Sequence, residues 1–134
     1  MKNWLVIVLL CAVSTVWAAD AAQSRLSEYT KTAKQPFSAE RGKAFWTQSH
    51  SHNSGVKQRS CASCHGEDVS KSGKHASTGK LIKPLSRNTN PVSLSDEKNI
   101  EKWFTRNCKW TLDRECSALE KGDVLTFLLT GVEK

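Results

Sequence analysis

The chain has 134 residues, of which 25% are charged and 38% are apolar. This length accommodates one small domain, and the composition excludes an intrinsically disordered chain. Lys and Arg outnumber Asp and Glu by 20 to 13, which favours an acidic partner, but the basic residues are spread along the chain, so we expect no nucleic-acid partner.

The N-terminus has the pattern of a secretory signal peptide. Lys2 precedes an unbroken apolar run over residues 4–13, and small residues follow up to Ala18. We therefore expect a signal peptide over 1–18, with Ala21 as an alternative cleavage point. An uncleaved membrane anchor is the other alternative, although the apolar run is short for a hydrocarbon layer of about 30 Å. The mature protein is expected to be periplasmic, without stable insertion in a membrane.

The mature chain is predicted to divide into an N-terminal extension, 19–37, and one main domain, 38–134. The extension contains a polar segment, 22–35, whose few large apolar residues fall at helical spacing. This pattern predicts a short helix that lies on the surface. Pro36 is expected to end it, because proline cannot continue a helix.

The main domain is predicted to begin with a helix over 39–48. Ser38 can cap this helix with its side-chain oxygen. The inner side of the helix is expected to carry Gly42, Phe45 and Trp46. A polar loop over 49–59 follows, and it contains two histidines, His50 and His52.

Cys61, Cys64 and His65 form the pattern Cys-x-x-Cys-His, which is typical of covalent haem c attachment. Two thiols at this spacing can each add to one vinyl group of a porphyrin, and the next imidazole can then bind the iron. A thioredoxin-like site would need a βαβ context, and a zinc site would need two further ligands. We therefore expect one haem c bound by Cys61 and Cys64, with His65 as its proximal ligand.

The segment 66–94 is rich in Gly, Ser, Asn and Pro and is interpreted as a loop over the haem edge. A helix is predicted to follow, with Ser95 as its N-cap and acidic residues in its first turn. Four residues of this helix fall at i, i+3, i+4 and i+7 and are expected to share its inward face: Ile100, Trp103, Phe104 and Asn107.

A last helix is predicted to close the chain. Ser117 and Glu120 form a Ser-x-x-Glu capping box at its start, and Gly131 is a plausible C-cap. Its apolar side is expected to comprise Leu119, Leu125, Leu128 and Leu129. Because strand signals are weak throughout, the predicted fold is all-α, a small cytochrome c fold with a covalently bound haem.

Cys108 and Cys116 are the remaining cysteines of the mature chain. In an oxidising compartment they are expected to pair as a disulfide. Two buried free thiols are the alternative.

The residue on the other side of the iron is not settled by pattern alone. Methionine is excluded as a ligand because the initiator is the only one in the chain. The remaining candidates are an empty site, His50, His52, His75, any lysine, such as Lys83, and Asn107. The three histidines lie in polar loops and are expected to be solvated. A buried Asn107 must find a partner, and spacing alone favours a C-cap or a core hydrogen bond over an iron ligand.

Several segments between residues 38 and 131 resemble the sphaeroides haem protein (SHP) family of cytochromes c. They include Arg41-Gly42-Lys43-Ala44-Phe45, Cys61 to Gly66, Lys83-Pro84-Leu85, Arg106-Asn107-Cys108 and Arg114-Glu115-Cys116. The resemblance implies a single haem c with His65 as proximal ligand, Asn107 as sixth ligand, and a disulfide between Cys108 and Cys116. It also implies that the Asn leaves the iron on reduction, that the ferrous haem binds oxygen or nitric oxide, and that a dihaem cytochrome c donates electrons.

The leading hypothesis is thus an exported gas-binding haem protein in an electron-transfer chain, as a terminal acceptor. Whether it is an enzyme that reduces oxygen or nitrogen oxides stays open at this point. A plain electron carrier with His/His or His/Lys ligation is the second hypothesis, and a haem-based gas or redox sensor is the third.

Overall fold

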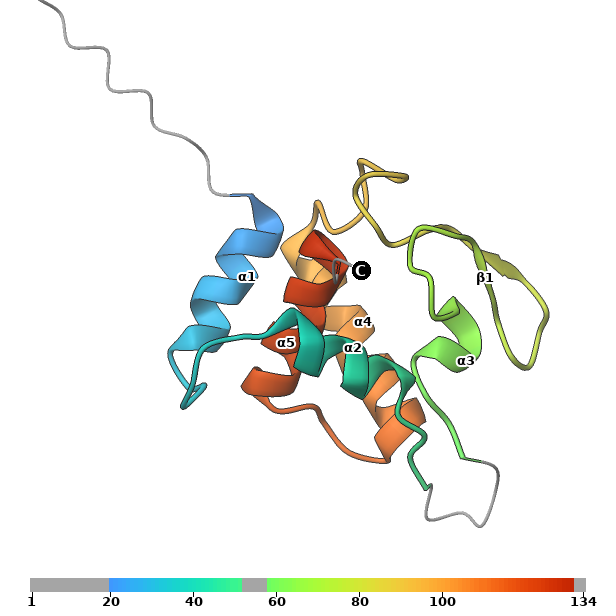
Figure 1. Cartoon of the computed structure of the whole chain (residues 1–134), viewed down its shortest axis with the longest axis horizontal. Coiled ribbons are helices and arrows are strands. Elements are labelled where there is room, and N and C mark those ends of the chain that lie inside the picture. The colour runs from blue at the N-terminus through green and yellow to red at the C-terminus, as the bar shows by residue number, and fades with distance from the viewer. Residues whose placement is uncertain (1–19, 52–57, 132–134) are drawn as a thin grey trace, which may run out of the picture.

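The computed structural model describes residues 20–51 and 58–131, and within them the fold is helical (Figure 1). The helices are α1 (Ala21–Thr30), α2 (Ala39–Thr47), α3 (Ala62–His65), α4 (Glu97–Leu112) and α5 (Ala118–Thr130). Two short strands, β1 (Gly73–Lys74) and β2 (Leu81–Ile82), pair antiparallel. The all-α prediction is confirmed, with this one hairpin inside the predicted loop 66–94. The signal peptide and His52 lie outside the described residues.

Helices α2 and α5 pack against each other at very short range. A Cβ on Gly42 would lie 2.1 Å from the backbone oxygen of Asp123, so only glycine permits this approach. Beside this contact, Asp123 accepts hydrogen bonds from the Ser38 backbone N–H and from the Arg41 side chain. Ser38 also caps α2, as predicted, by accepting from the Arg41 backbone N–H at 3.3 Å. The buried aspartate therefore fixes the start of α2 on α5.

Helix α1 differs from its prediction in both length and position. It ends at Thr30 rather than at residue 35, and it packs into the core instead of lying on the surface. Its residues Ala22 and Tyr29 are buried together with Ile100 and Leu125. The polar sequence of α1 predicted a surface position, but a single narrow apolar stripe is enough to bury one face of a helix when the neighbouring helices supply the rest of the core.

A carboxylate on α4 holds α1 in place. Glu101 accepts a hydrogen bond from the Tyr29 hydroxyl at 2.7 Å and one from the Arg25 guanidinium at 3.0 Å. Lys121 on α5 donates to the other Glu101 oxygen. Three helices thus meet at one side chain, which explains why α1 belongs to the folded domain.

Helix α4 begins one residue later than predicted. Asp96 is the N-cap and accepts from the Asn99 backbone N–H at 2.6 Å, whereas the Ser95 hydroxyl donates to the Val92 carbonyl. The predicted four-residue inward face is only partly right, because Trp103 is 50% exposed. Its ring instead lies beside two cations, Lys102 and Arg106, at 5.5 and 5.1 Å. Ile100 and Phe104 do contact the core.

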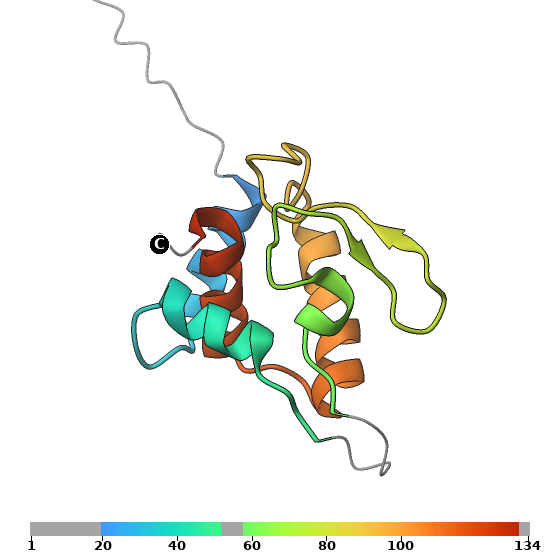
Figure 2. The ribbon, with the colours of Figure 1, turned by 45° about the vertical axis from the view of Figure 1, so that its right-hand side comes forward.

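Helix α5 is the central element of the core. The predicted capping box of Ser117 and Glu120 is present, and Gly131 is the C-cap. Leu125 is fully buried in one cluster, while Val124, Phe127 and Leu128 form a second cluster with Trp46. Figures 1 and 2 show α3 and the β1–β2 hairpin together at one side of these helices. Among the described residues, no helix is long and apolar enough to cross a membrane.

Candidate haem-binding site

The Cys-x-x-Cys-His residues lie on the single turn of α3. Cys61 is the N-cap residue, and the His65 backbone N–H donates to its carbonyl at 3.2 Å. Ser60 and Ser63 brace this turn reciprocally, because each backbone N–H donates to the other hydroxyl at 3.0 and 3.1 Å. The two thiols and the imidazole therefore leave the chain from one short, locally fixed segment.

Trp46 of α2 positions the histidine. Its ring lies 5.3 Å from the His65 ring, and its indole N–H donates to the Gly66 carbonyl at 2.8 Å. Trp46 is itself buried and packs edge-on against Phe127 at 6.0 Å. Burial lowers the pKa of His65, so the imidazole is neutral at pH 7 and has a lone pair available for a metal.

Cys61 and Cys64 are both free thiols and do not form a disulfide with each other. Burial raises the pKa of Cys61 to about 12, so this residue is a protonated thiol at neutral pH. The Cys64 sulfur accepts a hydrogen bond from the Ala76 backbone N–H at 3.4 Å. Two free thiols and a neutral imidazole on one turn are the donor set that a covalently attached haem c requires. The residues present therefore fit this cofactor.

The hairpin packs directly on this turn. A Cβ on Gly73 would lie 2.2 Å from the Cys64 carbonyl oxygen and 2.7 Å from the His65 Cα. β1 can approach α3 this closely only because it has no side chain there. The contact of Gly73 with α3 was not predicted from the sequence, because a glycine flanked by polar residues in a loop carries no signal that would reveal it.

Asn107 lies inside α4, five residues before its end at Leu112. The sequence predicted either a C-cap role or a core hydrogen bond for Asn107, and neither is found among the described residues. The C-cap of α4 is Asp113, and the side-chain amide of Asn107 has no hydrogen bond to any residue within 20–51 or 58–131. Three residues along the same helix, Trp110 meets the chain that leads into α3, because the Arg59 guanidinium donates to its carbonyl at 2.9 Å and stacks over its ring at 4.4 Å.

The residue after Asn107 is linked to α5. Cys108 and Cys116 form a disulfide with their Cα atoms 5.6 Å apart, and both are buried. The bond joins the last turns of α4 to the residue that precedes the N-cap of α5. The end of α4 is therefore attached covalently to the helix that carries the core.

The other candidate ligands lie in different surroundings. The backbone of His50 pairs with Arg59, its ring lies 5.3 Å from Phe45, and its buried Nε2 atom has no hydrogen-bond partner among the residues that the structure describes. His75 is exposed in the hairpin turn, where its Nδ1 accepts from two backbone N–H groups of the same turn. Lys83 is exposed directly after β2.

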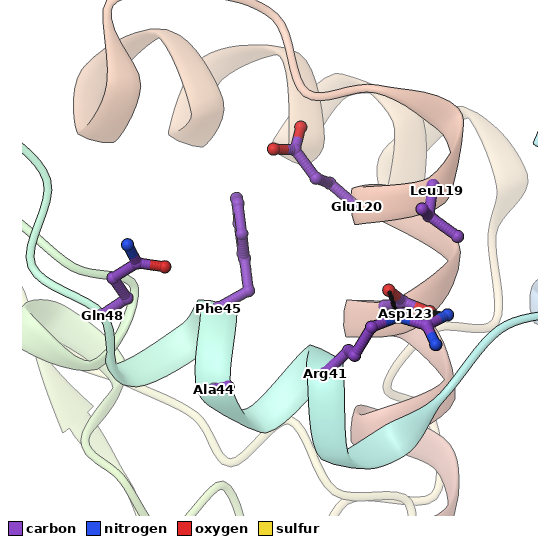
Figure 3. Close-up of a pocket in the computed structure, with 7 residues that line it drawn as sticks. All are labelled: Arg41, Ala44, Phe45, Gln48, Leu119, Glu120 and Asp123. Carbon is purple, nitrogen blue, oxygen red and sulfur yellow. Dashed lines mark hydrogen bonds and ion pairs between the residues drawn. The ribbon is translucent and has the colours of Figure 1, made fainter.

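A separate pocket of about 290 Å³ lies between α2 and α5 (Figure 3). Phe45 and Glu120 face each other across it, and the Arg41–Asp123 ion pair forms part of its lining. None of the Cys-x-x-Cys-His residues lines this pocket. The pocket is thus distinct from the α3 segment.

A helical fold with a Cys-x-x-Cys-His turn, two free thiols and a neutral histidine defines a c-type cytochrome. A family model described as "Domain of unknown function (DUF1924)" matches residues 32–128. The cytochrome c-type protein SHP of Cereibacter sphaeroides is 33% identical over 130 residues, which cover 96% of this chain and 98% of that protein. Cytochrome c'' of Methylophilus methylotrophus is 37% identical over 89 residues, 66% of this chain and 61% of that protein.

Solved structures agree with these relatives. Oxidised SHP, described as an oxygen-binding cytochrome c, superposes with a TM-score of 0.75 at 33% identity, covering 84% of this chain and 98% of that one. Oxidised cytochrome c'' from Methylophilus methylotrophus also gives 0.75, at 32% identity, with 84% and 96% covered. The chain belongs to the SHP family of cytochromes c. It carries a single, covalently bound haem c.

Proposed function

We propose that Cys61 and Cys64 form the two thioether bonds to the haem and that His65 is the proximal iron ligand. The support is local: both thiols are free, and burial keeps the imidazole neutral. Trp46 orients the segment through its hydrogen bond to the Gly66 carbonyl. The bound haem supplies a redox-active iron, and these residues hold it in one position.

Asn107 is proposed as the sixth ligand of the ferric form. The observation that carries this assignment is its amide, which lies in the middle of a helix without a hydrogen-bond partner among the described residues. The side chain is half-buried, and the iron would provide this amide with a partner from the protein's own site. An amide oxygen is a hard, weak donor that suits ferric iron better than ferrous iron.

This weak ligand leads to the function. Reduction would weaken the bond to Asn107 and open a site for a diatomic gas, oxygen or nitric oxide. The solved SHP structure is described as that of an oxygen-binding cytochrome c, which supports the same activity here. The disulfide between Cys108 and Cys116 anchors the adjacent backbone, so the amide can leave the iron while the helix end stays attached to α5. The protein would serve as the terminal acceptor of an electron-transfer chain, with a dihaem cytochrome c as donor.

The proposed location is the periplasm, after removal of the signal peptide. Asp20 favours cleavage after Ala18 over cleavage after Ala21. It is the N-cap residue of α1, and its carboxylate accepts two hydrogen bonds from the Arg87 guanidinium, which also lower the pKa of Asp20. Cleavage after Ala21 would remove this ion pair and the first residue of α1. N-terminal sequencing of the exported protein tests the assignment.

Replacement of Asn107 tests the gas-binding function. Asn107→Ala should convert the ferric haem from low-spin to high-spin or water-ligated, leave haem attachment intact, and raise the ferric affinity for small anions. Asn99→Ala is the matched control, because Asn99 is an exposed asparagine of the same helix. Reduced wild-type protein should be high-spin and bind carbon monoxide, oxygen and nitric oxide.

A bis-histidine electron carrier is the second candidate, favoured by the buried Nε2 of His50, which has no hydrogen-bond partner within the described part of the chain. In that case His50→Ala abolishes the low-spin ferric spectrum, Asn107→Ala preserves it, and the reduced protein stays six-coordinate. That result would refute the assignment of Asn107 and remove the main support for gas binding.

A further inference from the structure

The segment from residue 69 to residue 95 carries an unbalanced charge. It contains five basic residues and no Asp or Glu. Two of the five are neutralised from outside the segment, because Lys71 pairs with Asp68 at 3.4 Å and Arg87 pairs with Asp20. The other three have no ion-pair partner among the described residues and are all exposed: Lys74, Lys80 and Lys83. They lie in one element, the hairpin of residues 73–83, which we call the basic hairpin.

The two faces of the basic hairpin differ. Gly73 pairs with Ile82 and Lys74 pairs with Leu81, and paired residues of an antiparallel ladder point to the same face. The Gly73–Ile82 face is turned toward α3, as the close approach of Gly73 to Cys64 requires. The Lys74–Leu81 face is therefore turned outward.

Leu81 is the apolar centre of this outward face. Its side chain is 75% exposed, and lysines lie opposite it on β1 and on either side along the chain. A single exposed leucine would need no explanation, but an exposed leucine in a hairpin with three lysines that have no ion-pair partner among the described residues has the composition of a protein-binding patch with an apolar centre and a charged rim. The charge of the rim selects an acidic partner.

The basic hairpin is also connected to the haem-binding turn. The Ala76 backbone N–H in its turn donates to the Cys64 sulfur at 3.4 Å, and Gly73 touches the backbone of the same cysteine. Figures 1 and 2 show the hairpin extending outward from α3 at the edge of the molecule. The hairpin that carries the outward face is therefore in direct contact with a residue proposed to be bonded to the haem.

We propose that the basic hairpin is the docking surface for an electron-donor protein whose own redox cofactor lies under an acidic surface. This partner assignment rests on the proposed haem attachment at Cys61 and Cys64. The donor loses one electron and the ferric iron gains it to become ferrous; no covalent bond is formed or broken, and the proposed coordination of the iron by Asn107 weakens. Electrostatic attraction accelerates the encounter, and Leu81 provides the apolar contact of a short-lived complex.

The test uses two reductants that differ in charge and size. Flavodoxin hydroquinone is the probe for an acidic donor protein, and photochemically generated lumiflavin semiquinone is the small neutral reductant. The variants are Lys80→Glu, Lys74→Glu and Leu81→Ser. Lys34→Glu is the matched control, because Lys34 is an exposed lysine of the segment between α1 and α2. Figures 1 and 2 show this segment on the opposite side of the molecule from the hairpin.

At low salt, each charge reversal in the hairpin should slow reduction by flavodoxin about tenfold, and the difference should shrink in about 0.5 M NaCl. Lys34→Glu should change this rate less than about twofold, and the lumiflavin rate should be equal in all proteins. Leu81→Ser should slow reduction by flavodoxin at both salt concentrations, because it removes an apolar contact and not a charge. As a binding measurement, oxidised flavodoxin should shift backbone amide resonances of residues 73–83 in the ¹⁵N-labelled protein.

Equal flavodoxin rates for Lys80→Glu and Lys34→Glu, or amide shifts confined to other surfaces, would overturn the docking assignment. A fast lumiflavin reaction in the same samples shows that the haem is attached and reducible, so that such a failure concerns the docking surface alone. Were the haem not attached, the proposed haem site would be wrong, while the amide shifts would still decide where flavodoxin binds.

Discussion

The approach of β1 to the haem-binding turn is tested by Gly73→Ala. The added Cβ would lie 2.2 Å from the Cys64 carbonyl oxygen, roughly 1 Å inside an ordinary C···O contact of about 3.3 Å. Both neighbours are backbone atoms, so no side chain can rotate away. Overpacking of this kind costs about 1–3 kcal/mol, and the reduced freedom of the unfolded chain offsets about 0.4–1 kcal/mol. We expect a net loss of about 1–2 kcal/mol.

For a domain of this size, that loss corresponds to a fall in Tm of roughly 4–8 °C, measured by circular dichroism and by the Soret band of the haem-loaded protein. The hydrogen bond from the Ala76 amide to the Cys64 sulfur should also weaken, so this amide should exchange faster with deuterium. Gly79→Asn is the control in the same hairpin. Gly79 has a φ of +69°, which asparagine tolerates, and its nearest neighbour is a mobile Lys74 carbon at 3.4 Å. If Gly73→Ala has the same Tm as the wild type and its Ala76 amide exchanges with deuterium at the same rate, β1 does not pack on α3 as described.

Three further predictions concern contacts away from the hairpin. Trp46→Phe should retain haem but lose about 1–2 kcal/mol in denaturant unfolding, because the hydrogen bond to the Gly66 carbonyl is removed; unchanged stability would contradict this role. Burial would raise the pKa of Glu101, but hydrogen bonds from Lys121 and Tyr29 and the nearby cations outweigh it, so the pKa lies below its usual 4.5. The stabilisation by Glu101 is therefore present at neutral pH and is lost as the pH falls below about 4.5. The difference in unfolding free energy between wild type and Glu101→Gln should shrink over that range, and a constant difference would argue against a stabilising role of the Glu101 carboxylate. Alkylation of unreduced, unfolded protein should label neither Cys108 nor Cys116 by mass spectrometry, and labelling of both would disprove the disulfide.

The helix boundaries illustrate which signals are local. The capping box of Ser117 and Glu120 and the cap at Ser38 were predicted correctly because each involves residues three positions apart on one turn. The N-cap of α4 was placed one residue early, since Ser95 and Asp96 are both good caps. Which one caps the helix depends on Val92, because the Ser95 hydroxyl donates to its carbonyl.

The sequence by itself determined the class of cofactor and the helical class of the fold. Cys61, Cys64 and His65 need only one helical turn to present two thiols and an imidazole together, so their spacing is sufficient evidence. The same holds for the absence of a methionine ligand, which is a matter of composition alone.

Only the tertiary structure decided what surrounds that turn. Trp46 reaches the backbone next to His65 across 20 positions of the chain, and Tyr29 reaches Glu101 across 72. The burial of α1 and the contact of the hairpin with Cys64 likewise depend on how distant segments fold onto one another. A periodic pattern records which face of a helix is apolar, but it does not record which segment will cover that face, because that choice is made by packing among all the elements at once.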